Sequence, residues 1–163
     1  MDRPTTTKLL TNLMHLKFNA NDYYASEVTI NKGQKGKECR VDFMKFEPLN
    51  HSQSGIEKGE FYAYEVKSSL ADFNSPHGHN FIADRNYYVM PMAVYAKVVN
   101  SIPHHVGVYA PIPHASNKFE EFNNPTKLVD DVDLYDLKCI KHAHLQDRAI
   151  SSLMLLVMMF RSG

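Results

Sequence analysis

The sequence predicts an α/β fold in which a mixed β-sheet is flanked by helices. Three strand patterns joined by turn and loop residues lie between residues 23 and 67, as in an antiparallel meander. A strand, helix, strand order between residues 86 and 110 implies a right-handed parallel crossover. An apolar helix pattern is present near each end of the chain, at residues 8–18 and at about residues 145–160. These observations together predict antiparallel pairing at one end of the sheet and parallel pairing at the other.

Length and composition fit one domain with one hydrophobic core. The chain has 163 residues, of which 44% are hydrophobic. We expect a single domain with a core at about residues 5–113 and a C-terminal extension that carries the helix at about 145–160. The 18 basic and 18 acidic residues leave a formal net charge of zero. That balance argues against a protein that coats nucleic acid through bulk charge, but it allows a local basic patch.

The cysteines and the apolar segments indicate in which cellular compartment the protein is expected. Cys39 and Cys139 form no metal-binding pair, and their pattern is not typical of a secreted protein. The N-terminus does not resemble a secretory signal, and the longest apolar run, at residues 153–160, is too short to span a bilayer. We therefore expect a cytoplasmic protein with no membrane partner.

The first half of the chain alternates strand and turn signals. A run of three threonines at residues 5–7 is expected to cap the first helix. The predicted strands are 23–30, 40–46 and 60–67, separated by a glycine- and lysine-rich turn at 31–38 and a polar loop at 48–59.

The second half predicts helices and strands in alternation. We expect a short helix at 68–73, a loop at 77–80, a strand at 86–90, a helix at 92–100 and a strand at 106–110. Residues 111–125 are loop-like, and residues 126–136 give only weak signals. One face of the last helix is formed by Ile150, Leu153, Met154, Val157 and Met158.

The third predicted strand ends in a charged pair that organises the functional interpretation. Alternation places Glu65 and Lys67 on one face, about 7 Å apart along the strand. Pairing with the preceding strand would bring Asp42 beside them. Two carboxylates and a lysine on adjacent strands can hold a divalent cation and act on a phosphodiester. The alternative is a solvated Glu–Lys pair on an exposed strand face.

The pattern Asp42…Glu65-x-Lys67 resembles the active-site motif of the PD-(D/E)XK nuclease superfamily. Residues 65–73 and 86–91 extend the likeness to the MmcB-like branch, whose members are described as DNA-repair endonucleases. The match covers about residues 26–113. The resemblance implies a restriction-endonuclease-like core and metal-dependent hydrolysis of DNA phosphodiester bonds, in DNA repair or in the processing of phage or mobile-element DNA.

The resemblance also implies roles for individual residues. Asp42, Glu65 and the backbone carbonyl of Val66 would bind Mg²⁺ or Mn²⁺, and Lys67 would orient the attacking water or stabilise developing charge. Members of the superfamily often take a further acid from an upstream segment, for which Glu27, placed here on a strand, is the candidate. The residue before the first acid is valine rather than the proline of the motif.

Other residues have a functional and a structural interpretation. Ser69 and Asp72 are candidates to support the site, although Ser69 can instead cap the short helix and Asp72 can cap the turn that follows it. The histidine pairs lack cysteines at ligand spacing and favour loop positions over a zinc site. Tyr87 and Tyr88 are expected to be one core and one surface residue rather than a base-stacking platform. The candidates for contacts with the DNA backbone are Lys32, Lys35 and Lys37. The alternative interpretation is that they form a solvated charged turn.

A second function class is a catalytically silent nuclease-fold protein that binds or inhibits a partner. The neutral net charge and the unmatched residues 114–163 favour it, whereas the intact acid, acid and lysine pattern disfavours it. The sequence leaves open DNA versus RNA, endonuclease versus exonuclease action, substrate specificity and the oligomeric state, with a dimer among the alternatives.

Overall fold

The computed structural model describes residues 1–162, and within them a six-stranded sheet follows the order of the chain. Pairing is antiparallel for β1–β2, β2–β3 and β5–β6, and parallel for β3–β4 and β4–β5. The predicted α/β class, with a meander at one end of a mixed sheet, is therefore confirmed. The strands are β1 (Tyr23–Ile30), β2 (Cys39–Glu47), β3 (Glu60–Val66), β4 (Arg85–Val89), β5 (Gly107–Pro113) and β6 (Tyr135–Lys141).

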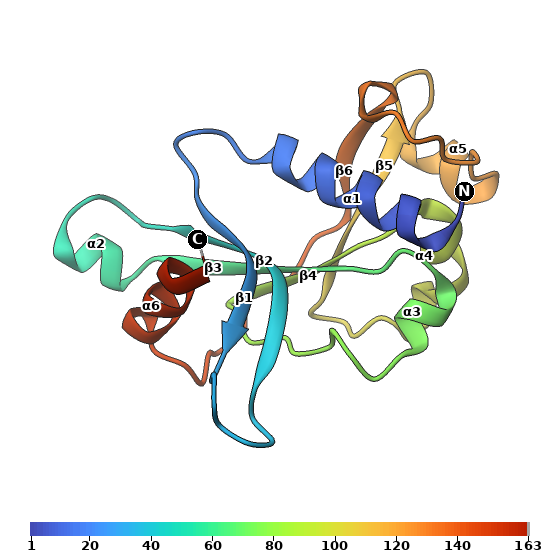
Figure 1. Ribbon diagram of the computed structural model, residues 1–163. Helices are drawn as coiled ribbons and strands as arrows, with labels where there is room; N and C mark the ends of the chain where they lie inside the picture. Colours follow the sequence, from blue (N-terminus) through green and yellow to red (C-terminus); the bar gives the residue numbers. More distant parts are fainter. Residues whose placement is uncertain (163) are drawn as a thin grey trace.

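Helices cover both faces of this sheet (Figure 1). One face packs against α1. The other packs against α6 over the first three strands and against α3 and α4 over β4 and β5. The helices are α1 (Arg3–Lys17), α2 (Gln53–Glu57), α3 (Leu70–Asn74), α4 (Met92–Val98), α5 (Lys118–Asn123) and α6 (Ser152–Ser162), with 3₁₀ turns η1 (Val99–Ser101) and η2 (Val132–Leu134).

Helix α1 begins five residues earlier than the sequence predicts. Asp2 is its N-cap and accepts a hydrogen bond from the Thr5 amide at 2.9 Å. Pro4 is tolerated in the first turn, where an amide would lack an intrahelical partner. The expected threonine cap was wrong for this reason. The buried face is the predicted one and consists of Leu9, Leu10, Leu13 and Met14.

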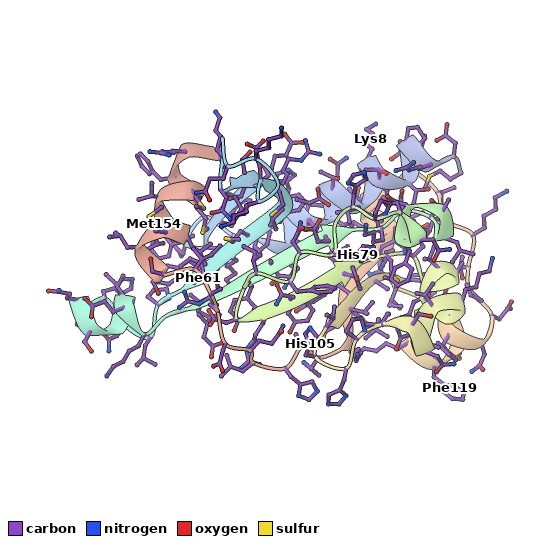
Figure 2. All side chains as sticks on the ribbon, turned by 90° about the horizontal axis from the view of Figure 1, so that it is seen from below. Lys8, Phe61, His79, His105, Phe119 and Met154 are labelled. Carbon is purple, nitrogen blue, oxygen red and sulfur yellow. The ribbon has the colours of Figure 1, made fainter. Side chains whose placement is uncertain are left out.

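Helix α6 is held against the sheet by a buried ion pair. Arg148, just before the helix, donates from Nε to both carboxylate oxygens of Asp84 at 2.8 Å. The same carboxylate accepts from the Phe61 amide at 2.7 Å, and the Phe61 ring lies 5.0 Å below the guanidinium. Figure 2 shows Phe61 close to α6, with Met154 on the outer side of that helix. The C-terminal segment is thus tied to strand β3, which carries Glu65.

Helix α6 begins at Ser152 rather than at about residue 145, and its predicted face was wrong. Leu155, Met158 and Met159 are buried, whereas Leu153 and Met154 are exposed and Ile150 precedes the helix.

Three further parts of the chain differ from the sequence prediction. The loop predicted at 48–59 contains α2, which Ser52 caps. The loop predicted at 111–125 contains the end of β5 and the helix α5, capped by Asn117. Strand β6 was not predicted, because its half-buried side chains do not alternate between faces. Among residues 1–162, no helix is long and apolar enough to cross a membrane.

Candidate active site

The site forms where β2 and β3 separate. Their ladder ends at the pair Phe43 and Tyr64, whereas the β1–β2 hairpin continues beyond that point. At the next position the Asp42 carboxylate accepts a hydrogen bond from the Val66 amide at 2.8 Å, where a strand carbonyl would otherwise be the acceptor. The side chain of Asp42 therefore extends the pairing and is held beside Glu65.

The carboxyl groups of Asp42 and Glu65 lie side by side, and each affects the pKa of the other. Burial, with Glu65 only 6% exposed, and then the charge of Asp42 raise the pKa of Glu65 to about 8. The Lys67 ammonium and the Asn80 amide act in the opposite direction without cancelling this rise. Burial also raises the pKa of Asp42, against the hydrogen bond from Val66. The pair is therefore destabilised when both groups are ionised and no cation is bound.

Lys67 is 3% exposed and lies at the base of the site. Its Nζ donates to the backbone carbonyl of His77 at 2.5 Å and to that of Asp72 at 3.4 Å. An ammonium has three donors, so one N–H is left for a water or a substrate oxygen. Gly78, at φ +72°, lies directly against the site, because a Cβ there would be 2.7 Å from the Lys67 Nζ and 3.2 Å from Oε2 of Glu65.

Ser69 and Asp72 support the backbone that follows Lys67. The Ser69 hydroxyl caps α3 by accepting from the Asp72 amide at 3.1 Å. The Asp72 carboxylate accepts from the Ser68 amide at 3.1 Å and from Arg3 of α1 at 3.1 Å. Asp72 thus orders the start of the helix, and its carbonyl holds Lys67.

Glu27 occupies the middle of β1 in a left-handed conformation, with φ 53°. Such a backbone is uncommon for a residue other than glycine and is often found at functional sites. Glu27 follows the register that pairs Ser26 with Phe43, so it lies opposite Asp42 in the hairpin. Its side chain is 73% exposed and lies 3.9 Å from Arg40. Glu27 lines the wall of the site, and its side chain makes no hydrogen bond to Asp42 or Glu65.

A polar pocket of about 710 Å³ surrounds these groups and is closed on one side by α1. Asn80 bridges the walls by donating to Oε1 of Glu65 at 3.4 Å and to the Arg40 carbonyl at 3.3 Å. Sequence reasoning missed the lining residues from α1, although a spacing of four marks them as one stripe. These residues are Arg3, Thr7, Thr11 and His15.

The other predicted candidates lie away from the pocket. Lys32, Lys35 and Lys37 are exposed in the β1–β2 turn and do not line the pocket. Tyr87 and Tyr88 are both buried, so the expectation of one surface tyrosine was wrong. Strand β4 is central and has helices on both faces, which explains the burial of both rings.

The histidines have structural roles where the structure defines their partners. Nε2 of His79 faces the carbonyls of Phe73 at 3.0 Å and Ser75 at 2.9 Å and therefore donates, which leaves Nδ1 to accept from the Tyr88 hydroxyl at 2.6 Å. Figure 2 shows His79 inside the fold and His105 at its edge. Within residues 1–162, no group of three histidine, cysteine or acidic side chains is arranged to hold a metal ion.

The donor set at the carboxyl pair nevertheless fits a hard divalent cation. Mg²⁺ uses oxygen ligands, keeps several waters and is commonly bound through one or two carboxylates. Asp42 and Glu65 supply these, and a cation would offset the cost of burying two carboxylates and the repulsion that raises the pKa of Glu65. The amide of Val66 points toward Asp42, and in an extended strand the carbonyl of the same residue is directed to the same side. Val66 thus stays a candidate third ligand.

Comparisons with known proteins support the fold alone. The SPO1766 protein of unknown function from Silicibacter pomeroyi has a similar solved structure, with a TM-score of 0.53 and 18% sequence identity. The alignment covers 99% of this chain and 84% of that one. Neither the family models nor the curated proteins gave a match to this chain.

Proposed function

We propose that this chain is a metal-dependent nuclease that hydrolyses DNA phosphodiester bonds. The observation that carries the proposal is the placing of the half-buried Asp42 carboxyl beside the buried Glu65 carboxyl, with Lys67 lining the same polar pocket. A purely structural Glu–Lys ion pair would not explain why a second carboxyl group of raised pKa lies beside Glu65. We further propose membership of the PD-(D/E)XK superfamily, in its MmcB-like branch, and a cytoplasmic role in DNA repair or in phage or mobile-element DNA processing.

Each residue of the site has a role in this chemistry. Asp42 and Glu65 would hold Mg²⁺ or Mn²⁺, together with the Val66 carbonyl. The bound cation polarises the phosphate and lowers the pKa of a bound water. Lys67 directs its free N–H toward the water or a phosphate oxygen, while the carbonyls of His77 and Asp72 fix the ammonium in place. Asn80 orients Glu65 by donating to Oε1.

One observation favours the second candidate, a catalytically silent nuclease-fold protein. The backbone at His77 and Gly78 lies against Lys67, so the ammonium is bound by the protein itself and is almost completely buried. A protein that only binds DNA or another partner needs no access to this group. Turnover requires that a phosphate reach the remaining N–H through the side of the pocket lined by α1 and the β1–β2 hairpin.

A divalent-ion titration with a plasmid and a panel of oligonucleotides separates the two candidates. Mg²⁺ or Mn²⁺ should support cleavage, EDTA should stop it, and Ca²⁺ should bind without supporting it well, because a larger and looser ion positions water poorly. Asp42→Ala should be inactive while its far-UV CD is unchanged. Metal-dependent DNA binding without cleavage under any condition would instead establish the silent protein. Activity that persists in EDTA would exclude the proposed site.

A further inference from the structure

One wall of the pocket is a polar stripe along α1. Arg3, Thr7, Thr11 and His15 are four residues apart, and a helix of 3.6 residues per turn places them on one side. All four line the pocket, and the stripe starts beside Asp72 and ends beside Phe43. At a rise of about 1.5 Å per residue it is about 18 Å long. This length equals about five base-pair steps along the axis of B-form DNA.

The stripe presents hydrogen-bond donors and no carboxylate. No acidic residue occurs anywhere in α1, from Arg3 to Lys17. The side chain of Arg3 is 63% exposed and uses one Nη2 contact to Asp72, which leaves most of its five N–H donors free. The Thr7 hydroxyl donates to the Arg3 carbonyl, whereas the Thr11 hydroxyl is available. The phosphate-binding members are therefore Arg3, Thr11 and His15.

His15 is oriented at the far end of the stripe. Its ring meets the Phe43 ring edge-on at 5.1 Å, and its Nδ1 lies 3.4 Å from the Tyr24 hydroxyl. When the hydroxyl donates to Nδ1, the proton of the neutral imidazole is on Nε2, which becomes a donor. The ring can then hold a phosphate oxygen without a change in its own charge.

The acidic side chains of the pocket and the donors of α1 lie on different walls. Five acidic side chains line the pocket against three permanent cations, so the formal charge is −2 when all five are ionised. The carboxylates belong to the hairpin, to β3 and to α3, whereas α1 contributes only a guanidinium and neutral donors. A phosphodiester is therefore repelled near Asp42 and Glu65 until a cation is bound, and it is attracted along α1.

We propose that the α1 stripe is the track for the sugar–phosphate backbone of the DNA strand whose scissile phosphate reaches Glu65. This inference rests on the proposed function and names the surface that binds the substrate. It assigns backbone binding to Arg3, Thr11 and His15 rather than to the lysines of the β1–β2 turn. Binding at the track depends on a divalent cation, because the cation offsets the acidic wall.

Lys8 provides a matched control for Arg3. It lies on the same helix, its side chain is 67% exposed, and it makes one surface ion pair, with Asp130 at 3.5 Å. It does not line the pocket. Arg3→Gln and Lys8→Gln each remove one positive charge from α1, so bulk charge affects both variants equally. Arg3→Lys keeps the charge and should restore most of the affinity.

Fluorescence anisotropy with labelled single-stranded and duplex oligonucleotides in Ca²⁺ tests the track. We expect Arg3→Gln to weaken binding and to reduce the slope of log K against log salt by about 1, while Lys8→Gln changes neither. The double variant Thr11→Glu with His15→Glu should weaken binding at least about tenfold, because two new charges would face phosphate. Melting temperatures and far-UV CD spectra establish that each variant is folded.

Parallel cleavage assays in Mg²⁺ keep the two proposals apart. If the parent cleaves DNA and the stripe variants bind and cleave as Lys8→Gln does, the track is refuted and the nuclease stands. If the parent binds DNA through the stripe and never cleaves it, the track stands and the nuclease is refuted. If the parent neither binds nor cleaves any oligonucleotide with Ca²⁺, Mg²⁺ or Mn²⁺, both are refuted.

Discussion

Burial and the charge of Asp42 raise the pKa of Glu65 from 4.5 to about 8, and this shift should appear in the stability of the protein. Between these two pH values the unfolded chain ionises Glu65 while the folded protein keeps it protonated, so the folded state binds more protons. The free energy of unfolding therefore falls as pH rises through this window. At about 1.4 kcal/mol per pKa unit, the loss is about 5 kcal/mol. The raised pKa of Asp42 acts in the same direction.

Glu65→Gln keeps the shape of the side chain and removes the ionisable group. In EDTA, we expect the variant to match the parent at pH 5 and to be more stable than the parent by several kcal/mol at pH 8.5. Mg²⁺ at one hundred times its dissociation constant should add about 2.7 kcal/mol to the parent at pH 8.5, because it binds the ionised pair in the folded state only. The variant should gain much less, since one carboxylate ligand is lost.

Urea unfolding followed by far-UV CD at pH 5, 7 and 8.5 measures these differences. Glu57→Gln is the control, because Glu57 is an exposed residue of α2 whose carboxylate accepts a hydrogen bond from Gln53. This control should leave the pH dependence of the parent intact. The opposite outcome is a parent whose stability stays level or rises between pH 5 and pH 8.5, with Glu65→Gln no more stable than the parent at pH 8.5. That outcome would show that Glu65 is ionised in the folded protein and that neighbouring groups stabilise its charge. The description of the carboxyl pair would then be wrong.

Two other predictions concern positions around the site. Gly78→Ala should slow cleavage by at least about tenfold, because its Cβ would lie 2.7 Å from the Lys67 ammonium. Gly33→Ala, also at positive φ but with nothing within 4 Å, should cost only about 1 kcal/mol of stability and no activity. Equal activities of the two variants would contradict this. Asp84→Ala should cost about 3–5 kcal/mol in urea unfolding, because it leaves Arg148 buried without its partner, whereas Asp130→Ala in the surface pair should cost less than about 1 kcal/mol. Similar losses in both would exclude the buried pair as the anchor of α6.

The central part of the site could be located from the sequence because it depends on local rules. Strand alternation fixes Glu65 and Lys67 on one face, and consecutive strands of a meander pair with each other, which brings Asp42 alongside. The repulsion between the two carboxyl groups also follows from their adjacency. The sequence could not show that burial, rather than this repulsion, is the first cause of both raised pKa values.

The remaining parts depend on contacts between distant segments. The α1 stripe is recognisable as a face, but only the packing of α1 beside the hairpin makes it a wall of the pocket. In the sequence Gly78 cannot be told from any other loop glycine. Its closeness to Lys67 comes from the path of the loop after α3. Strand β6 lacks a periodic pattern because it is an edge strand, and its pairing with β5 defines it.

Single-turnover cleavage of a labelled duplex in Mg²⁺ tests the central claim most directly, namely that Asp42, Glu65 and Lys67 act as one hydrolytic site. The parent is compared with Asp42→Asn, Lys67→Ala and the double variant, all at enzyme concentrations that saturate the DNA. We predict that each single variant loses at least about a hundredfold in rate and that the double variant is no slower than the slower single one, because the residues act as a unit. Cleavage by Lys67→Ala or Asp42→Asn at the rate of the parent would contradict the claim.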